Sequence, residues 1–394
     1  MPRERLFLLA GFFFGSFGWN VCWPFLPLRV QDVGVGGLAE VARISGYIAG
    51  GSNLITAVLA PWWSMAGERW GFRRQVIRAH LGMGTAMGAI GLARVPLELV
   101  GAGALLGMLG GNYPHYMALV AMRAAPNEVG RVIGDLQAAG QFGATLGPLL
   151  GGAIASQFGV PVAFFAATAI SFGAALMIAT QVTPDRGLGR AREESGGLRD
   201  SLRDPRTRWL MAILVVGDAG IQGLRPLIPI VIATRTDNPG EIAAVTGIGA
   251  TMVTGGGILS ALTLGRAAKN IHPRRILIVS LPVACLFAAA IPFATSIPLL
   301  VGVWTLLGIA GGAISPCVFA WLGRNGAGGS GFALLASTSM LGFAIGPALM
   351  GQLTVYGLDL PFYGAAALAT VTIALIALYR DRAGIIAPGD PRSP

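Results

Sequence analysis

Residues 6–27 read LFLLAGFFFGSFGWNVCWPFLP, an apolar run that closes on Pro24-Phe-Leu-Pro27. A run of about 20 apolar residues is long enough to cross the hydrocarbon core of a bilayer as a helix. No cleavage site of small residues follows this basic and then apolar start, so we expect it to remain as the first membrane helix. The closing Pro-x-x-Pro recurs in the second half of the chain as Pro226-Leu-Ile-Pro229. The two stretches predict a membrane protein built from two related halves.

The composition of the whole chain favours a lipid environment. Of the 394 residues, 54% are hydrophobic and only 12% are charged, whereas soluble domains carry about 25% charged residues. A soluble core could not bury this much apolar surface. The three cysteines lie in separate apolar runs without a CxxC motif, and the three histidines are far apart in the sequence. We therefore expect neither a metal site nor a cofactor.

Apolar runs of this kind predict about twelve membrane-spanning helices. We expect them near Leu6–Pro27, Val41–Met65, Val76–Ala93, Leu99–Met122, Arg131–Gln157, Pro161–Val182, Trp209–Ile232, Ala243–Leu264, Ile276–Thr295, Pro298–Leu322, Gly331–Val355 and Pro361–Tyr379.

The positive charge of the chain indicates how these helices are oriented. With the N-terminus placed in the cytoplasm, most of the 28 Lys and Arg residues fall in cytoplasmic segments, as the positive-inside rule requires. We expect a multi-pass protein of the plasma membrane (the inner membrane, in a bacterium with two) with both termini cytoplasmic. The formal net charge of +10 is then an orientation signal, and we expect no nucleic-acid partner.

An internal repeat predicts the domain organisation. A six-plus-six duplication with both termini inside implies parallel repeats, with the substrate site between the halves. We expect a six-helix bundle at residues 1–183, a cytoplasmic linker at 184–208, a second six-helix bundle at 209–382 and a disordered tail at 383–394. The patches that match in order are Pro24–Pro27 with Pro226–Pro229, Gly71–Arg74 with His272–Arg275, Gly107, Gly110 and Gly111 with Gly308, Gly311 and Gly312, and Gly143, Gly147 and Pro148 with Gly342, Gly346 and Pro347.

The loop after the second expected helix reads Ser64-Met-Ala-Gly-Glu68-Arg69-Trp-Gly71-Phe-Arg73-Arg74. It resembles the G-x-L-A-D-R-x-G-R-R signature of the major facilitator superfamily, with Ser64 in place of the first glycine and Glu68 in place of the aspartate. The resemblance covers nearly the whole chain and implies the fold of two six-helix bundles. It also implies that a set of loop residues forms a cytoplasmic gate. These residues are Glu68, Arg69, Gly71, Arg73 and Arg74.

The fifth expected helix resembles the antiporter motif of the proton-coupled drug efflux branch of this superfamily. Gly143, Gly147 and Gly151 recur every four residues, which leaves a smooth stripe where another helix can approach closely. The proline of the motif permits a bend. The alternative is that the motif serves packing alone. The matching residues are Gly134, Gly143, Gly147, Pro148, Gly151 and Gly152.

Polar residues inside the expected helices indicate a substrate path, because such groups are costly in a membrane and tend to face a cavity. Asp218, Gln222 and Arg225 share one face of the seventh helix by their spacing. We expect Asp218 to couple protons, with a structural ion pair as the alternative. His115 is a second candidate, with a hydrogen bond to a neighbouring helix as the alternative. The expected cavity residues are Asn20, Trp23, Asn53, Asn112, Tyr113, Tyr116, Gln137, Gln141, Gln222, Arg225 and Trp304.

These patterns predict a monomeric secondary transporter that exports small amphipathic compounds by proton antiport, and not an enzyme. Its expected partners are a small-molecule substrate, protons and the lipid bilayer. An ATP-driven pump is disfavoured because Lys269, the only lysine, is followed by Asn270 and forms no Walker motif. The superfamily's acidic residue in the first helix and arginine in the fourth helix are missing, with Asn20 and Gly103 in those regions. Uptake or facilitated diffusion of a polar metabolite therefore stays open, as does a non-transporting receptor or assembly protein on the same fold.

Overall fold

The computed structural model describes residues 2–125, 128–185, 202–268, 270–324 and 329–379. Within these ranges the regular secondary structure is entirely helical, which confirms the all-α prediction. The expected tail at 383–394 lies outside the described residues. So does most of the expected linker at 184–208, of which residues 184–185 and 202–208 are described.

The described part of the first half forms seven longer helices and two short ones around the first proline motif. They are α1 (Pro2–Cys22), η1 (Trp23–Phe25), α2 (Leu26–Asp32), α3 (Leu38–Trp70), α4 (Phe72–Leu92), α5 (Pro96–Leu109), α6 (Tyr113–Arg123), α7 (Val129–Phe158) and α8 (Val160–Gln181).

The second half follows a similar succession of long and short helices, with one additional 3₁₀ turn, η3, after α13. They are α10 (Pro205–Gly223), η2 (Arg225–Leu227), α11 (Ile228–Ala233), α12 (Pro239–Ala267), α13 (Pro273–Ala290), η3 (Ile291–Phe293), α14 (Ile297–Gly311), α15 (Ile314–Arg324), α16 (Gly329–Leu353) and α17 (Leu360–Leu378).

The helices have the length and composition of membrane spans. Among the described residues, eight helical segments are long and apolar enough to cross a bilayer. Large apolar side chains on them point outward, such as Leu176, Val279 and Leu286, each about two-thirds exposed. Apolar patches of this extent are rare on soluble monomers. The chain is therefore an integral membrane protein.

The first spanning segment of each half is broken at its Pro-x-x-Pro motif. Pro24 lies in η1 and Pro226 lies in η2. Proline has no backbone N–H and cannot complete the helical hydrogen-bond pattern. The break places Trp23 in one half and Arg225 in the other at the start of the short 3₁₀ turn, next to the boundary between the halves.

Two helix pairs join the halves, α3 with α16 and α7 with α12. Gly46 of α3 faces the backbone of Pro347, and Gly152 of α7 faces the backbone of Gly247. A Cβ atom added at Gly46 or Gly152 would run into that backbone. Small residues thus let the helices approach more closely than side chains would allow.

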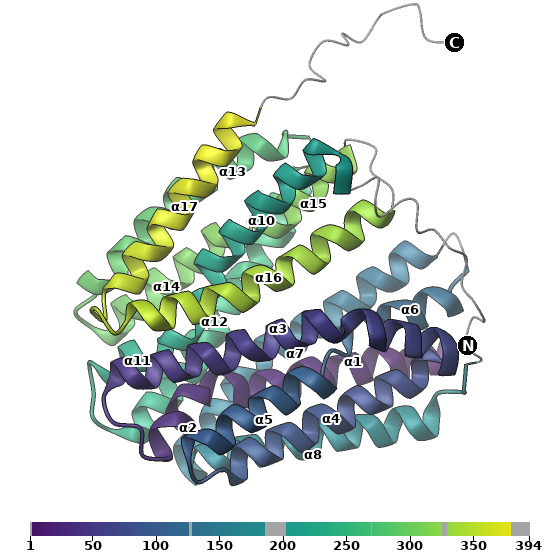
Figure 1. Ribbon diagram of the computed structural model, residues 1–394, viewed down its shortest axis with the longest axis horizontal. Coiled ribbons are helices and arrows are strands. Elements are labelled where there is room, and N and C mark those ends of the chain that lie inside the picture. Colours follow the sequence, from purple (N-terminus) through teal and green to yellow (C-terminus); the bar gives the residue numbers. More distant parts are fainter. Residues whose placement is uncertain (1, 126–127, 186–201, 269, 325–328, 380–394) are drawn as a thin grey trace, which may run out of the picture.

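Polar contacts between the halves are few. No ion pair among the described residues joins them. Figure 1 shows the helices of the halves converging near α2 and α11, which we call the joined end, and diverging toward the N-terminus. Among the residues that the structure describes, three hydrogen bonds cross between the halves, namely Tyr47 Oη to Gln352 Oε1 (2.5 Å), Asn53 Nδ2 to the Phe343 carbonyl (3.2 Å) and Thr354 Oγ1 to the Ala39 carbonyl (3.0 Å).

Candidate substrate cavity and buried carboxylate

A cavity of about 380 Å³ lies between the halves, and we call it the central cavity. Its walls come from α1, η1, α2, α3, α6 and α7 in the first half and from α10, η2, α11, α12 and α16 in the second. The expected cavity residues that the structure brings together here are Asn20, Trp23, Asn53, Tyr113, Gln222 and Arg225.

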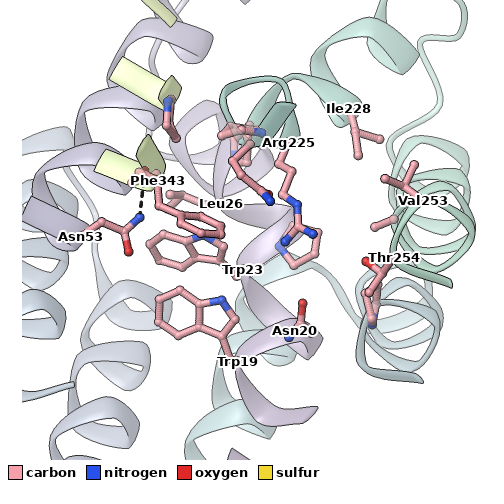
Figure 2. Close-up of a pocket in the computed structure, with 18 of the residues that line it drawn as sticks. Trp19, Asn20, Trp23, Leu26, Asn53, Arg225, Ile228, Val253, Thr254 and Phe343 are labelled. Atoms are coloured by element: carbon pink, nitrogen blue, oxygen red, sulfur yellow. Dashed lines mark hydrogen bonds between the residues drawn. The ribbon is translucent and has the colours of Figure 1, made fainter. Parts of the chain in front are cut away.

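One wall of the central cavity is aromatic. The rings of Trp19 and Trp23 stack with their centroids 4.4 Å apart, and Figure 2 shows Phe343 beside them. Phe343 comes from α16, where nothing in an apolar run distinguishes it from a packing residue, so sequence reasoning missed it. Trp19 lies one turn before Trp23 on the same face, and the sequence already indicates it as an aromatic residue that could hold a ligand. The wall can hold a flat apolar body.

The opposite wall carries one charge. Arg225 is exposed, and it lines the central cavity. Figure 2 shows its guanidinium pointing into the space between Asn20 and Thr254. Gln222, one turn earlier, also lines the cavity, and its Oε1 is buried without a hydrogen-bond partner in the part of the chain described.

Asp218 lies deeper, in a smaller cavity of about 210 Å³ that shares Gln222 and Arg225 with the central cavity. The side chain is 3% exposed. Its carboxylate accepts hydrogen bonds from Ser339 Oγ at 2.5 Å and from Ser315 Oγ at 3.3 Å. Gln141 and Trp304, both expected cavity residues, line this smaller space as well. Sequence reasoning missed the two serines, because Ser315 is the one serine of the tenth expected helix and Ser339 is one of two in the eleventh.

The polar residues of the fourth expected helix take other positions. Tyr116 is fully buried and its hydroxyl lies 2.8 Å from His80 Nε2. His115 is also buried, 3.4 Å from the guanidinium of Arg78. Neither Tyr116 nor His115 lines a described cavity. Both therefore belong to a hydrogen-bonded cluster within the first half, because the break between α5 and α6 turns them away from its boundary.

Two further expected residues lie beside the aromatic wall. Asn112 and Tyr113 line a small cavity of about 250 Å³ together with Asn53. Gln137 of α7 donates a hydrogen bond to the Tyr113 hydroxyl at 3.2 Å. This side pocket adjoins the central cavity through Trp19, Asn53 and Tyr113.

The expected gate loop is a tight connection between α3 and α4. Gly71 has a φ of +96°, a conformation open to glycine at little cost. The carboxylate of Asp185 accepts from the backbone N–H groups of Phe72 at 2.6 Å and Arg73 at 2.9 Å. The Arg73 guanidinium donates to the Ala179 carbonyl. The loop is thus capped by the first residues after α8, a partner that the motif alone did not identify.

The remaining residues of the loop are closer to solvent. Arg69 and Arg74 are exposed and Glu68 is partly buried. The guanidinium of Arg69 lies 5.9 Å from the ring centroid of Trp70. No ion pair of Glu68 is found among the described residues.

The glycine stripe of α7 packs against α1. Positions 143, 147 and 151 face the α1 backbone around Phe17 and Val21. Gly152 turns the other way, to the second half, and Gly134 has open space around it. Pro148 lies inside α7 and lines the central cavity. The helix therefore contacts α1, α12 and the cavity at once.

Comparison with known proteins finds sequence relatives of this chain. The chain is 30% identical to the multidrug resistance protein MdtG of Yersinia enterocolitica over 324 residues, which cover 80% of this chain and 77% of that protein. It is 31% identical to MdtG of Escherichia fergusonii over 328 residues, 80% of this chain and 78% of the relative.

Solved structures share the fold at low sequence identity. The nucleoside transporter NupG has a TM-score of 0.79 at 12% identity, covering 96% of this chain and 100% of that chain. A bacterial homologue of the human lysosomal transporter Spinster, in an inward-facing and occupied conformation, has a TM-score of 0.71 at 15% identity, covering 96% and 95%. A family model described as Major Facilitator Superfamily matches residues 8–255 and 210–393. This chain belongs to the Major Facilitator Superfamily, and it is a membrane transporter rather than an enzyme.

Proposed function

We propose that the chain exports small amphipathic compounds from the cytoplasm in exchange for protons, as a monomer in the plasma membrane with both termini cytoplasmic. The relatives named above are called multidrug resistance proteins. The central cavity supports the same substrate class, because it combines an aromatic wall with polar side chains. Pockets of this kind hold apolar ligands and orient them with a few polar contacts.

The observation that carries the proton-coupling part of this proposal is the position of Asp218. A carboxylate inside a membrane span is a functional candidate by default. Ser315 and Ser339 can rotate their hydroxyls to donate to a carboxylate or to accept from a carboxylic acid. The pair can therefore hold Asp218 in either protonation state, and Gln222 and Arg225 connect it to the substrate space.

Alternating access is the proposed mechanism of movement. We propose twelve spans, with each interrupted pair, such as α5 with α6, taken as one, and we propose that the two sets of six are repeats. Such halves rock about a site between them. The glycine contacts at the joined end supply a surface that can part and re-form. We propose that the joined end faces away from the cytoplasm, so that the central cavity is loaded from inside.

A test of the proposal uses purified protein in lightly buffered liposomes that enclose a pH dye, without an initial gradient. Aromatic amines, aromatic acids and uncharged amphipathic compounds are added outside, one at a time. Antiport moves protons out as the compound enters, so the internal pH rises, and only in liposomes with protein. Entry without proton movement would contradict coupling, and no entry of any compound would contradict transport of this class.

Cotransport of a proton with the substrate is the second candidate, and Arg225 favours it. If an anion occupies Arg225 while Asp218 is ionised, the site carries excess negative charge, whereas protonated Asp218 leaves it neutral. An uncompensated charge is costly to move through a medium of low dielectric constant. In the liposome assay, cotransport lowers the internal pH, which is the opposite sign to antiport.

A further inference from the structure

The central cavity has an unusual balance of charge for a site that handles amphipathic compounds. Among the described residues that line it, Arg225 is the one that carries a charge, and the remaining polar groups are amides, hydroxyls and indole nitrogens. Asp218, the carboxylate beside this cavity, is 3% exposed and accepts hydrogen bonds from two serine hydroxyls. A bulky cation in this space would meet a guanidinium and no accessible carboxylate.

Arg225 is also held in this position by the backbone. It opens η2, between the fully buried Leu224 and the proline that breaks the helix. Among the described residues it forms no ion pair within 4.0 Å. It therefore presents free donors to the cavity, whereas Arg29 and Arg235, near the ends of the two broken segments, donate to backbone carbonyls.

We propose that the central cavity selects amphipathic anions, with an acidic group of the substrate on the guanidinium of Arg225 and an apolar body against Trp19, Trp23 and Phe343. A guanidinium offers parallel N–H donors that match the two oxygens of a carboxylate, and such charge-assisted bonds are the strong ones. Figure 2 places Arg225 across the cavity from the two indole rings, so one rigid molecule can contact both walls. This inference rests on the proposed function in taking the central cavity as the substrate site.

The test is a binding measurement, which does not depend on transport. Wild-type protein in nanodiscs of zwitterionic lipid is titrated with 2-naphthoate, 2-naphthylmethanol and 2-naphthylmethylamine, and binding is followed by quenching of tryptophan fluorescence. The three probes share one aromatic body and differ in charge. We expect the acid to bind about tenfold more tightly than the alcohol, in line with a hydrogen bond to a charged group, and the amine to bind most weakly.

Variants assign the preference to one side chain. Arg225→Gln keeps hydrogen-bond donors without the charge and should bring the acid and the alcohol to equal affinity. Arg225→Lys keeps the charge and should retain part of the preference. Arg235→Gln is the matched control, because Arg235 donates to the Ala294 carbonyl and does not line the cavity. It should leave the order of the three probes unchanged.

The outcomes separate this inference from the proposed function. An amine that binds as tightly as the acid in wild-type protein overturns the inference, as does a preference for the acid that survives Arg225→Gln. The wild-type comparison decides even if a variant fails to fold. If the acid binds selectively but none of the probes crosses liposomes, the selectivity stands and the transport proposal fails.

Discussion

In the first half of the molecule, the break after Cys22 presents Trp23 to the central cavity; in the second half, the break after Gly223 presents Arg225. The backbone device is the same, but the chemistry differs. In the first half, the buried His80 pairs with the Tyr116 hydroxyl inside the bundle, away from the cavity. Asp218, in contrast, lies beside the cavity. The comparison teaches that the first half supplies the stacked indole rings of the cavity, whereas the second half supplies the groups that respond to charge.

The largest effect is expected when the carboxylate of the second half is removed. Asp218→Asn should reduce proton-driven accumulation of substrate from as much as about a thousandfold, the limit set by roughly 180 mV of proton-motive force, to no accumulation. Exchange of labelled for unlabelled substrate should continue, because the cavity is intact. Both are measured in liposomes with an imposed gradient.

Two controls make this result specific. Asp204→Asn changes an acidic residue at the N-cap of the same helix, where asparagine also caps well, and should preserve accumulation. His115→Gln changes the buried cluster of the first half and should preserve coupling. Loss of coupling in His115→Gln would show that the first half also responds to protons.

The next effect concerns the contact between the halves. Gly46→Leu should destabilise the joined end by about 1–3 kcal/mol, because a side chain there meets the backbone of Pro347 and cannot be accommodated without shifts. Transport should fall strongly. Gly51→Leu is the matched control on the same helix, since a Cβ there meets nothing within 4 Å. Equal transport by the two variants would show that transport does not depend on the glycine contact.

A smaller effect tests the apolar wall. Trp23→Ala should weaken binding of the naphthoate, naphthylmethanol and naphthylmethylamine probes by a similar factor, roughly three- to tenfold, because it removes a stacked ring and no charge. Arg225→Gln should instead change their order. The same fluorescence titration, read through the remaining tryptophans, measures both. If Trp23→Ala weakened binding of the acid alone, the aromatic wall would contribute to charge selectivity, contrary to the role described for it.

The smallest effect is expected at the start of the third span, where the two halves cap the helix differently. α4 is capped by Asp185, which follows α8, whereas α13 is capped by His272, its own preceding residue. Asp185→Ala should cost about 1 kcal/mol of stability, as loss of a side-chain cap does elsewhere. Thermal unfolding in detergent measures the change, with Asp237→Ala, an acidic residue in the loop before α12, as the control. A shift no larger than that of the control would indicate that water replaces the cap.

The sequence predicted the helical fold and the family well, because apolar run length, proline and glycine depend on local physics. It also predicted that Asn20, Trp23, Gln222 and Arg225 line one cavity, since their spacing follows from the helix period and the repeat. It did not identify Ser315, Ser339 or Asp185, because their roles depend on which helices become neighbours. Tyr116 shows the reverse case. Its side chain looked suited to a cavity, but the turn between α5 and α6 sends it into the packed interior.

The few polar contacts across the halves also bear on how fast this protein can work. Each hydrogen bond between α3 and α16 or the residue after it contributes only about 1 kcal/mol net, and no ion pair among the described residues adds to them. Glycine-to-backbone contacts are lost within a small displacement, since dispersion falls steeply with distance. The joined end can thus hold firmly at rest yet release without a large activation barrier. Opening on the microsecond-to-millisecond scale of domain motions would then leave substrate release, rather than the rocking of the halves, to set the turnover rate.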